Sequence, residues 1–349
     1  MQILLGLLGL AIIGFTVTDI LSTTLTISGG GGPLTSRVSN WLWELMLRRH
    51  RSHTSHRSLM VAGYGIALTP FIVWIALIWF GWALIFNISD QAVVEAQSKA
   101  PADLWARIYF TGYTLFTLGM GDYQPQGPIW QILTAIASLS GFFLVTFAIS
   151  FLIPVVSAAT QERQLAAYIS SLGKEPEDIV IQAWKGDGFG MLTQHLITLT
   201  PMLALHAQRY PAYPILRYFH SMQRSTAAAP SIAVLDEALT LLEYGVLCDY
   251  RPDPATLYPV RQAVSEFLET LSSTFIHPTQ EAPPPPILDH LRMNGIPTLS
   301  DEAFQIAVED LAKRRRLLLA LVRNDGWSWH RDVMDQKPTK QFQSLNLPS

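Results

Sequence analysis

Three long apolar stretches dominate the pattern of hydrophobic and polar positions along this chain. Residues 3–27 include one charged side chain, Asp19, whereas residues 59–86 and 128–160 include none. About 20 consecutive apolar residues are enough to cross the hydrocarbon core of a bilayer as a helix. The pattern therefore predicts three membrane-spanning helices, followed by a more polar region that begins at residue 161.

Composition agrees with a membrane location. Of the 349 residues, 49% are hydrophobic and only 15% are charged, whereas soluble domains carry about 25% charged residues. The net charge of −3 argues against nucleic acid as a partner. The single cysteine, Cys248, excludes an intrachain disulfide framework. No catalytic constellation is recognisable, so we do not expect an enzyme.

The first apolar stretch lacks a basic leading segment and a small-residue cleavage pattern, so residues 1–27 are interpreted as a retained transmembrane helix and not as a signal peptide. Asp19 would be costly if it faced lipid, so we expect it to face protein or to lie near the cytoplasmic interface. A structural and a functional role for Asp19 both stay open.

Charge in the loops predicts the orientation of the chain. Residues 28–58 contain five arginines and one acid, Glu44, whereas the loop before residue 128 is richer in acids. Short basic loops stay in the cytoplasm. We therefore expect a multi-pass protein of the cell membrane, with the N-terminus outside and the C-terminus in the cytoplasm.

The basic loop has two features of its own. One helical face, typical of an interfacial helix, carries Val38, Trp41, Leu42, Leu45 and Met46. Three histidines follow at three-residue spacing: His50, His53 and His56. They could bind a metal or sense pH, but we favour a basic anchor for anionic lipid.

The most specific chemistry lies between the second and third stretches. A helix is expected from about Pro101 to Phe116, with Asp103 as its N-cap, and Gly119 and Gly121 follow closely. Glycine enters conformations with positive φ without steric cost. Two glycines two residues apart therefore allow successive carbonyl oxygens to face one axis, where they can replace the water shell of a cation.

The stretch from Tyr109 to Pro125 resembles the pore helix and selectivity filter of the potassium channel family, whose filter reads Thr-Val-Gly-Tyr-Gly-Asp. Four positions are identical to that filter: Thr117, Gly119, Gly121 and Asp122. Leu118 replaces a similar apolar residue, whereas Met120 stands where the family has Tyr or Phe. The resemblance implies that backbone oxygens bind permeant K⁺, with no other cofactor, at Thr117, Leu118, Gly119 and Met120.

The same resemblance assigns supporting roles. Tyr109 and Phe110 occupy the positions of an aromatic cuff around the filter, Thr114 belongs to the same support, and Tyr113 is expected to hydrogen-bond Asp122 behind it.

In the third apolar stretch the resemblance makes Gly141 the hinge of the inner helix, and Pro154 can kink that helix near its cytoplasmic end. Close helix packing is the alternative role for Gly141.

Residues 59–160 are therefore expected to form a pore module. Its outer helix, residues 59–86, would place Trp74, Trp79 and Trp82 as interfacial anchors. A single loop cannot surround an axis, so a homotetramer in the lipid bilayer is expected. The predicted fold class is an all-α membrane protein with a tetrameric P-loop cation channel pore and an α-helical cytoplasmic domain.

The cytoplasmic domain, residues 161–337, shows helical periodicity at 191–207, 232–247, 256–275 and 303–323. The glycines from Gly186 to Gly190 have the wrong spacing for a dinucleotide site and are interpreted as a loop. Lys313–Arg316 is expected to be a solvated face. Trp327, Trp329 and His330 are expected to pack against a core. An unidentified cytoplasmic ligand or protein is its expected partner, and residues 338–349 are expected to be a flexible tail.

The leading hypothesis is a passive, potassium-selective channel gated at the inner helix. A weakly selective monovalent cation channel is the first alternative, because Met120 changes the packing around the filter. A membrane sensor that keeps the pore architecture without conducting is the second.

Overall fold

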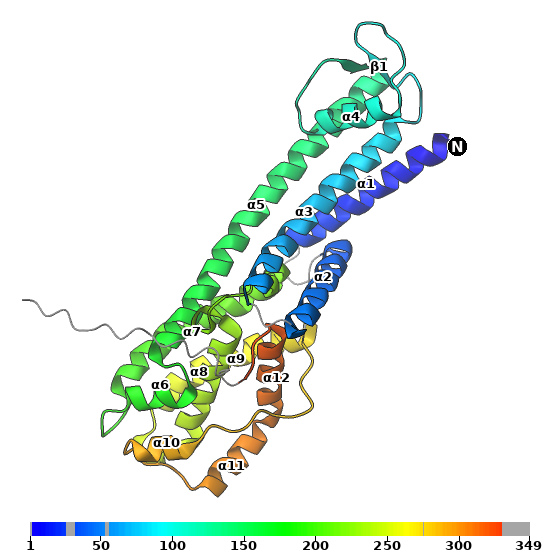
Figure 1. Ribbon diagram of the computed structural model, residues 1–349. Coiled ribbons are helices and arrows are strands. Elements are labelled where there is room, and N and C mark those ends of the chain that lie inside the picture. The colour runs from blue at the N-terminus through cyan, green and yellow to red at the C-terminus, as the bar shows by residue number, and fades with distance from the viewer. Residues whose placement is uncertain (1, 26–31, 53–55, 275, 330–349) are drawn as a thin grey trace, which may run out of the picture. The chain divides into compact units, whose positions relative to one another are not determined.

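The computed structural model describes residues 2–25, 32–52, 56–274 and 276–329 (Figure 1). It divides into two compact units. The first unit comprises Met1–Leu165 and Thr200–Thr226, and the second comprises Ala166–Leu199 and Ala227–Ser349.

Three helices are long and apolar enough to cross a membrane, as the hydrophobic pattern predicts: α1 (Gln2–Leu25), α3 (His56–Phe86) and α5 (Pro128–Leu172). The apolar span of α3 begins at Leu59. Helix α5 continues through Pro154 and twelve residues beyond residue 160. The predicted all-α membrane fold is confirmed.

Helix α1 runs alongside α3 (Figure 1) because two glycines let their backbones approach. A Cβ atom on Gly9 would lie 2.7 Å from the backbone oxygen of Gly81, and one on Gly81 would lie 2.6 Å from the side chain of Ile13. Small residues at such crossings let helices pack closely within a membrane. The first helix is therefore packed against the pore module.

The three tryptophans of α3 make hydrogen bonds inside the protein, and their role as interfacial anchors stays a prediction. Trp74 and Trp82 are buried, and each of the three indole N–H groups donates to an acceptor inside the protein. The acceptors are Asp19 Oδ2 at 2.8 Å for Trp74, the Ile108 carbonyl at 2.9 Å for Trp79 and Ser140 Oγ at 3.0 Å for Trp82. An indole N–H at membrane depth has no water to bond, so it is satisfied within the fold.

Asp19 is fully buried and organises the junction of three helices. Its carboxylate accepts from the backbone N–H of Leu34 at 2.8 Å and from the Thr35 hydroxyl at 2.6 Å. These residues form the first turn of α2 (Pro33–Ser52), where the helix dipole favours a negative charge. With the bond from Trp74, the carboxylate joins α1, α2 and α3. Asp19 thus has the structural role that the sequence left open.

A small antiparallel pair of strands, which the sequence did not indicate, forms in the loop between α3 and α5. Strand β1 (Val93–Glu95) precedes the short helix α4 (Leu104–Leu115), and β2 (Tyr123–Pro125) follows it. Val94 pairs with Gln124. Three-residue strands are too short to show an alternating pattern, so only their pairing reveals them.

Residues 200–226 belong to the first unit, although they lie within the cytoplasmic domain of residues 161–337 that the sequence predicts. They include the second part of α7 (Gly190–Ala212) and the short helices η1 (Pro214–Tyr218) and η2 (Arg224–Thr226). Tyr218 and Leu216 pack in one apolar cluster with Trp43 of α2. A Cβ atom on Gly63 of α3 would lie 2.0 Å from the Tyr218 carbonyl oxygen, so a glycine is needed there.

The second unit is a helical assembly. Its remaining helices and turns are α6 (Pro176–Ala183), α8 (Ala228–Thr240), η3 (Leu241–Gly245), η4 (Cys248–Tyr250), α9 (Pro254–Thr274), α10 (Leu288–Met293), α11 (Asp301–Asp310) and α12 (Ala312–Asn324). Helices occur in all four predicted segments, although the segment 303–323 is interrupted at Leu311. Residues 186–189 form a loop, as expected. Trp327 is buried, and His330 lies outside the described residues.

The basic run Lys313–Arg316 is only partly a solvated face, because Lys313 is exposed but Arg315 is buried. Arg315 is 2% exposed, and its guanidinium donates to both carboxylate oxygens of Glu237, at 2.7 and 3.0 Å. Arg314 and Arg261 both pair with the buried Asp236. Burial alone would raise the pKa of the Asp236 carboxyl, but the two guanidinium groups lower it. Sequence periodicity cannot indicate this arrangement, because the acids lie 78 positions away.

Replacing Arg315 should destabilise the second unit strongly. Arg315→Met leaves the Glu237 carboxylate buried without its bidentate partner, a loss of about 3–5 kcal/mol for comparable buried pairs. Thermal unfolding of the purified full chain measures the change. Arg292→Met is the matched control, because Arg292 pairs with Asp289 and Asp301 at the surface and its loss should matter much less. Equal effects of the two substitutions would contradict the importance of the buried pair.

Candidate functional site

Helix α4 is anchored between the two long helices α3 and α5. Asp103 is its N-cap, with its side chain accepting from the Ala106 N–H at 2.7 Å, as predicted. Trp79 of α3 lies against Gly112, where a Cβ atom would be 2.5 Å from the indole ring. Phe110 is buried and packs edge-on against Phe86 of α3 at 5.2 Å between ring centroids. These contacts determine where α4 ends and hence where the following loop begins.

The loop after α4 has an alternating backbone. Thr117, Gly119 and Gly121 have φ values of 56°, 60° and 83°, whereas Leu118 and Met120 between them do not have positive φ. Such alternation turns successive peptide groups so that their carbonyl oxygens face the same side. A positive φ is unusual for the β-branched Thr117 and costs about 1–3 kcal/mol, a strain that persists mainly at functional positions.

Backbone hydrogen bonds tie the start of this loop to α4. The Thr117 N–H donates to the Thr114 carbonyl at 3.1 Å, and the Leu118 N–H donates to the Tyr113 carbonyl at 2.9 Å. From Gly119 on, the loop is open, and a Cβ atom on Gly119 or Gly121 would meet nothing within 4 Å. The side chains of Leu118 and Met120 are 65% and 62% exposed on the single chain. This chain alone therefore does not provide the surrounding protein that we expected for them.

Tyr113 does not hydrogen-bond Asp122, which corrects the resemblance-based expectation. Its hydroxyl donates to the backbone carbonyl of Tyr123 at 2.6 Å. The Asp122 carboxylate lies next to the hydroxyl of Tyr109 instead. The ring of Tyr113 contacts those of Tyr109 and Phe110, with centroids 5.1 and 5.3 Å apart, and the three form an aromatic cluster beside the loop.

The strand pair holds the end of the loop that lies farther from α4. The Ala96 N–H donates to the Asp122 carbonyl at 2.8 Å, directly before β2. Arg107 of α4, largely buried, forms an ion pair with Asp90 at 2.8 Å. In the sequence, these two charges bear only on the orientation of the chain. The two residues are 17 positions apart, so the sequence did not indicate that they form an ion pair.

Gly141 of α5 contacts the end of α4. A Cβ atom there would lie 2.0 Å from the Leu115 carbonyl oxygen, two residues before Thr117. Close packing, the alternative role for Gly141, thus has direct structural support. Helix α5 is continuous at this position, and the hinge role of Gly141 and Pro154 stays a prediction.

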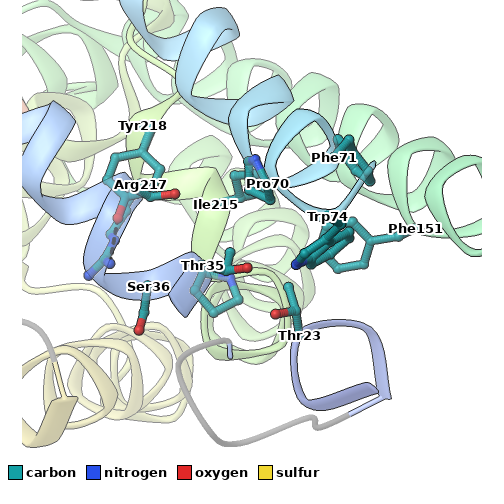
Figure 2. A pocket seen from close by; sticks show the side chains of 12 residues that line it. Thr23, Thr35, Ser36, Pro70, Phe71, Trp74, Phe151, Ile215, Arg217 and Tyr218 are labelled. Carbon is teal, nitrogen blue, oxygen red and sulfur yellow. Dashed lines mark hydrogen bonds between the residues drawn. The ribbon is translucent and has the colours of Figure 1, made fainter. Parts of the chain in front are cut away.

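Further along α5, Phe151 borders a small cavity shown in Figure 2. Its walls include Trp74 and Phe71 of α3, and Thr35 of α2 contributes a hydroxyl. The cavity measures only ≈ 20 Å³, room for about one water molecule. This region therefore joins α5 to its neighbours and does not offer a ligand site.

The predicted filter and its supports are thus adjacent in one segment, whereas Pro154 lies on a different level of α5. His53 lies outside the described residues, and the structure does not describe the side chains of His50 and His56. Among the residues that it does describe, no three His, Cys, Asp or Glu side chains form a metal-binding group.

Comparison with known proteins agrees with this geometry. Residues 63–158, which include α4 and the loop, match the family described as "Ion channel". The chain is also similar to the "uncharacterized membrane protein YdjJ" of Bacillus subtilis (strain 168), with 37% identity over 321 residues, 92% of this chain and 94% of the relative. No solved structure matches the chain.

The similarity to the Bacillus protein extends over nearly the full length of both chains, and the pore segment lies inside the matched channel region. This chain therefore belongs to the same family of membrane proteins as YdjJ and carries an ion channel domain at residues 63–158.

Proposed function

We propose that this protein is a passive, potassium-selective channel in which four copies of the chain surround one pore. The observation that carries the proposal is the alternation of positive φ at Thr117, Gly119 and Gly121. A bare ion in a medium of low dielectric is unfavourable by tens of kcal/mol unless other ligands replace its water. Carbonyl oxygens aligned on one side of a short loop supply those ligands.

A ring of oxygens requires several chains, because each chain has one such loop. Two features of the single chain support assembly into a homotetramer. The side chains of Leu118 and Met120 are exposed, and α5 exposes an apolar stripe at a spacing of three and four residues: Ile129, Ile132, Ile136, Leu139 and Phe143. Neighbouring copies can cover both.

The orientation follows from charge. With the arginine-rich loop in the cytoplasm, the N-terminus lies outside, the C-terminus lies in the cytoplasm, and the filter lies toward the outer face. Asp122 then adds negative charge near the outer mouth. The dipole of α4 directs its negative end toward the inner cavity, which favours cations there.

Gating is assigned to α5. Because Gly141 contacts the Leu115 carbonyl, movement of α5 at this level would displace the end of α4. Leu115 lies two residues before the filter segment, so the inner helix and the filter are mechanically linked.

Gly119→Ala should abolish ion conduction. Gly119 has φ of +60°, and an L-residue in the left-handed region costs about 1–2 kcal/mol, so the loop would abandon the alternating backbone. The measurement is K⁺ flux from liposomes that contain the purified protein, with assembly checked by light scattering. Gly186→Ala, at φ of +95° in a loop of the second unit, is the control and should conduct normally. Normal flux through Gly119→Ala would refute the filter assignment.

Met120→Tyr should preserve or sharpen the preference for potassium. An aromatic residue restores the side chain that potassium channels have at this position, where neighbouring copies would surround it in the proposed tetramer. Reversal potentials in K⁺ and Na⁺ gradients measure the preference, with Leu118→Val as a control. A reversal potential near zero in the unaltered protein would favour the weakly selective channel, and complete loss of current in the variant would contradict the expectation.

Gly141→Ala should lower both flux and thermal stability. The added Cβ meets the Leu115 carbonyl at 2.0 Å and forces α5 away from α4. Gly14→Ala of α1 is the control, since its Cβ would meet nothing within 4 Å. Alanine is the better helix former by about 1 kcal/mol, so a role as hinge alone predicts reduced flux with unchanged or higher stability. Differential scanning fluorimetry separates the two roles.

A further inference from the structure

A second cavity, of ≈ 210 Å³, lies against the part of α5 that follows Pro154. Two helix faces border it, and on each face the lining residues are three and four positions apart. Helix α5 contributes Ala158, Gln161 and Glu162, and α7 contributes Met202, His206 and Arg209. All six residues belong to the first unit.

The polar groups of this cavity are of complementary kinds. Arg209 presents a guanidinium that donates to the side-chain oxygen of Gln161. Glu162 contributes a half-buried carboxylate. His206 is 7% exposed, and burial lowers its pKa to about 4, so its imidazole is neutral at neutral pH. The cavity therefore offers a cation, an anion and a neutral donor and acceptor beside the apolar side chains of Ala158 and Met202.

This combination selects among ligand classes. A cavity of ≈ 210 Å³ has room for a molecule of the size of one amino acid. A divalent cation would need several acidic or imidazole ligands, and the described residues contain no cluster of three. A zwitterion, in contrast, can pair with both charges at once.

We propose that this cavity binds a free α-amino acid with an apolar side chain. Its ammonium group lies toward Glu162, its carboxylate lies toward Arg209, and its side chain contacts Met202 and Ala158.

The regulatory consequence rests on the proposed channel function. Ala158 lies four residues after Pro154, so a ligand here contacts the inner helix just beyond its proposed gate. A ligand that bridges α5 and α7 shifts the gate only as far as its affinities for the open and closed forms differ. Binding itself does not depend on conduction.

The first experiment measures binding by isothermal titration calorimetry with the purified full chain in detergent. The probes are L-leucine, 4-methylpentanoate, which lacks the ammonium group, and leucinamide, which lacks the carboxylate. L-leucine should bind saturably, and each analogue should bind roughly tenfold more weakly or worse, because one charged hydrogen bond is lost. Absence of saturable leucine binding, or equal affinity for all three probes, overturns the proposal.

Two variants locate the site. Glu162→Gln should weaken leucine binding roughly tenfold or more while leaving the affinity for 4-methylpentanoate unchanged. Arg209→Gln should also weaken leucine binding, but it should leave the affinity for leucinamide unchanged. Glu269→Gln, an exposed carboxylate of the second unit, is the control and should bind leucine normally. Unchanged leucine affinity in both cavity variants overturns the site. Arg209 also bonds Gln161, so Arg209→Gln could misfold. In that case the affinities of the unaltered protein for the three probes still decide the proposal.

The second experiment adds L-leucine to the K⁺ flux assay. Leucine should change the flux of the unaltered protein, and the change should be smaller in Glu162→Gln. Flux that is insensitive to leucine, although leucine binds, overturns the regulatory role. If the protein conducts no ion under any condition but still binds leucine, the proposed channel function fails and the site stands. If it conducts but does not bind leucine, the site fails and the channel stands.

Discussion

Backbone polar groups at membrane depth need partners, and this constraint shapes the whole pore region. The segment from Thr117 to Asp122 is neither helix nor strand, so it cannot satisfy its own N–H and C=O groups. Its first two N–H groups bond back to α4, and its last carbonyl, that of Asp122, accepts from the N–H of Ala96, which directly follows β1. The carbonyl oxygens between these two anchors are the ones that the proposed filter would offer to a dehydrated cation. Support at both ends thus leaves an oxygen-rich centre.

The same constraint governs side chains inside the membrane region. Asp19 is buried in a helix otherwise free of charge, yet backbone and side-chain donors from two other helices surround its carboxylate. The indole groups of α3 likewise find acceptors on α1, α4 and α5. These buried and partly buried hydrogen bonds join the elements of the first unit more strongly than similar bonds at a surface would. The first helix becomes part of the pore module by this means.

Helix α5 runs past the pore loop and both cavities. It contacts the end of α4 at Gly141, borders the small cavity at Phe151 and lines the larger polar cavity from Ala158 onward. In the proposed channel, a displacement of this continuous helix at one level would also move the residues at another level. The strain held at Thr117 is located where such a displacement would arrive.

The sequence alone was enough to establish the three membrane helices, because twenty apolar residues have few other stable environments. It was also enough to locate the candidate pore loop and the Asp103 cap, since glycine spacing and capping are local properties. It did not reveal the bond from Tyr113 to Tyr123, the partners of Asp19 or the packing of residues 200–226 within the first unit. It misassigned Arg314 and Arg315 to a solvated face. Each of these features depends on which distant segments meet, and a one-dimensional pattern records the character of a helix face but not the partner that covers it. Only the tertiary structure decided those pairings, because a buried charge or indole N–H is stable only where the fold brings a partner from a distant segment within bonding distance.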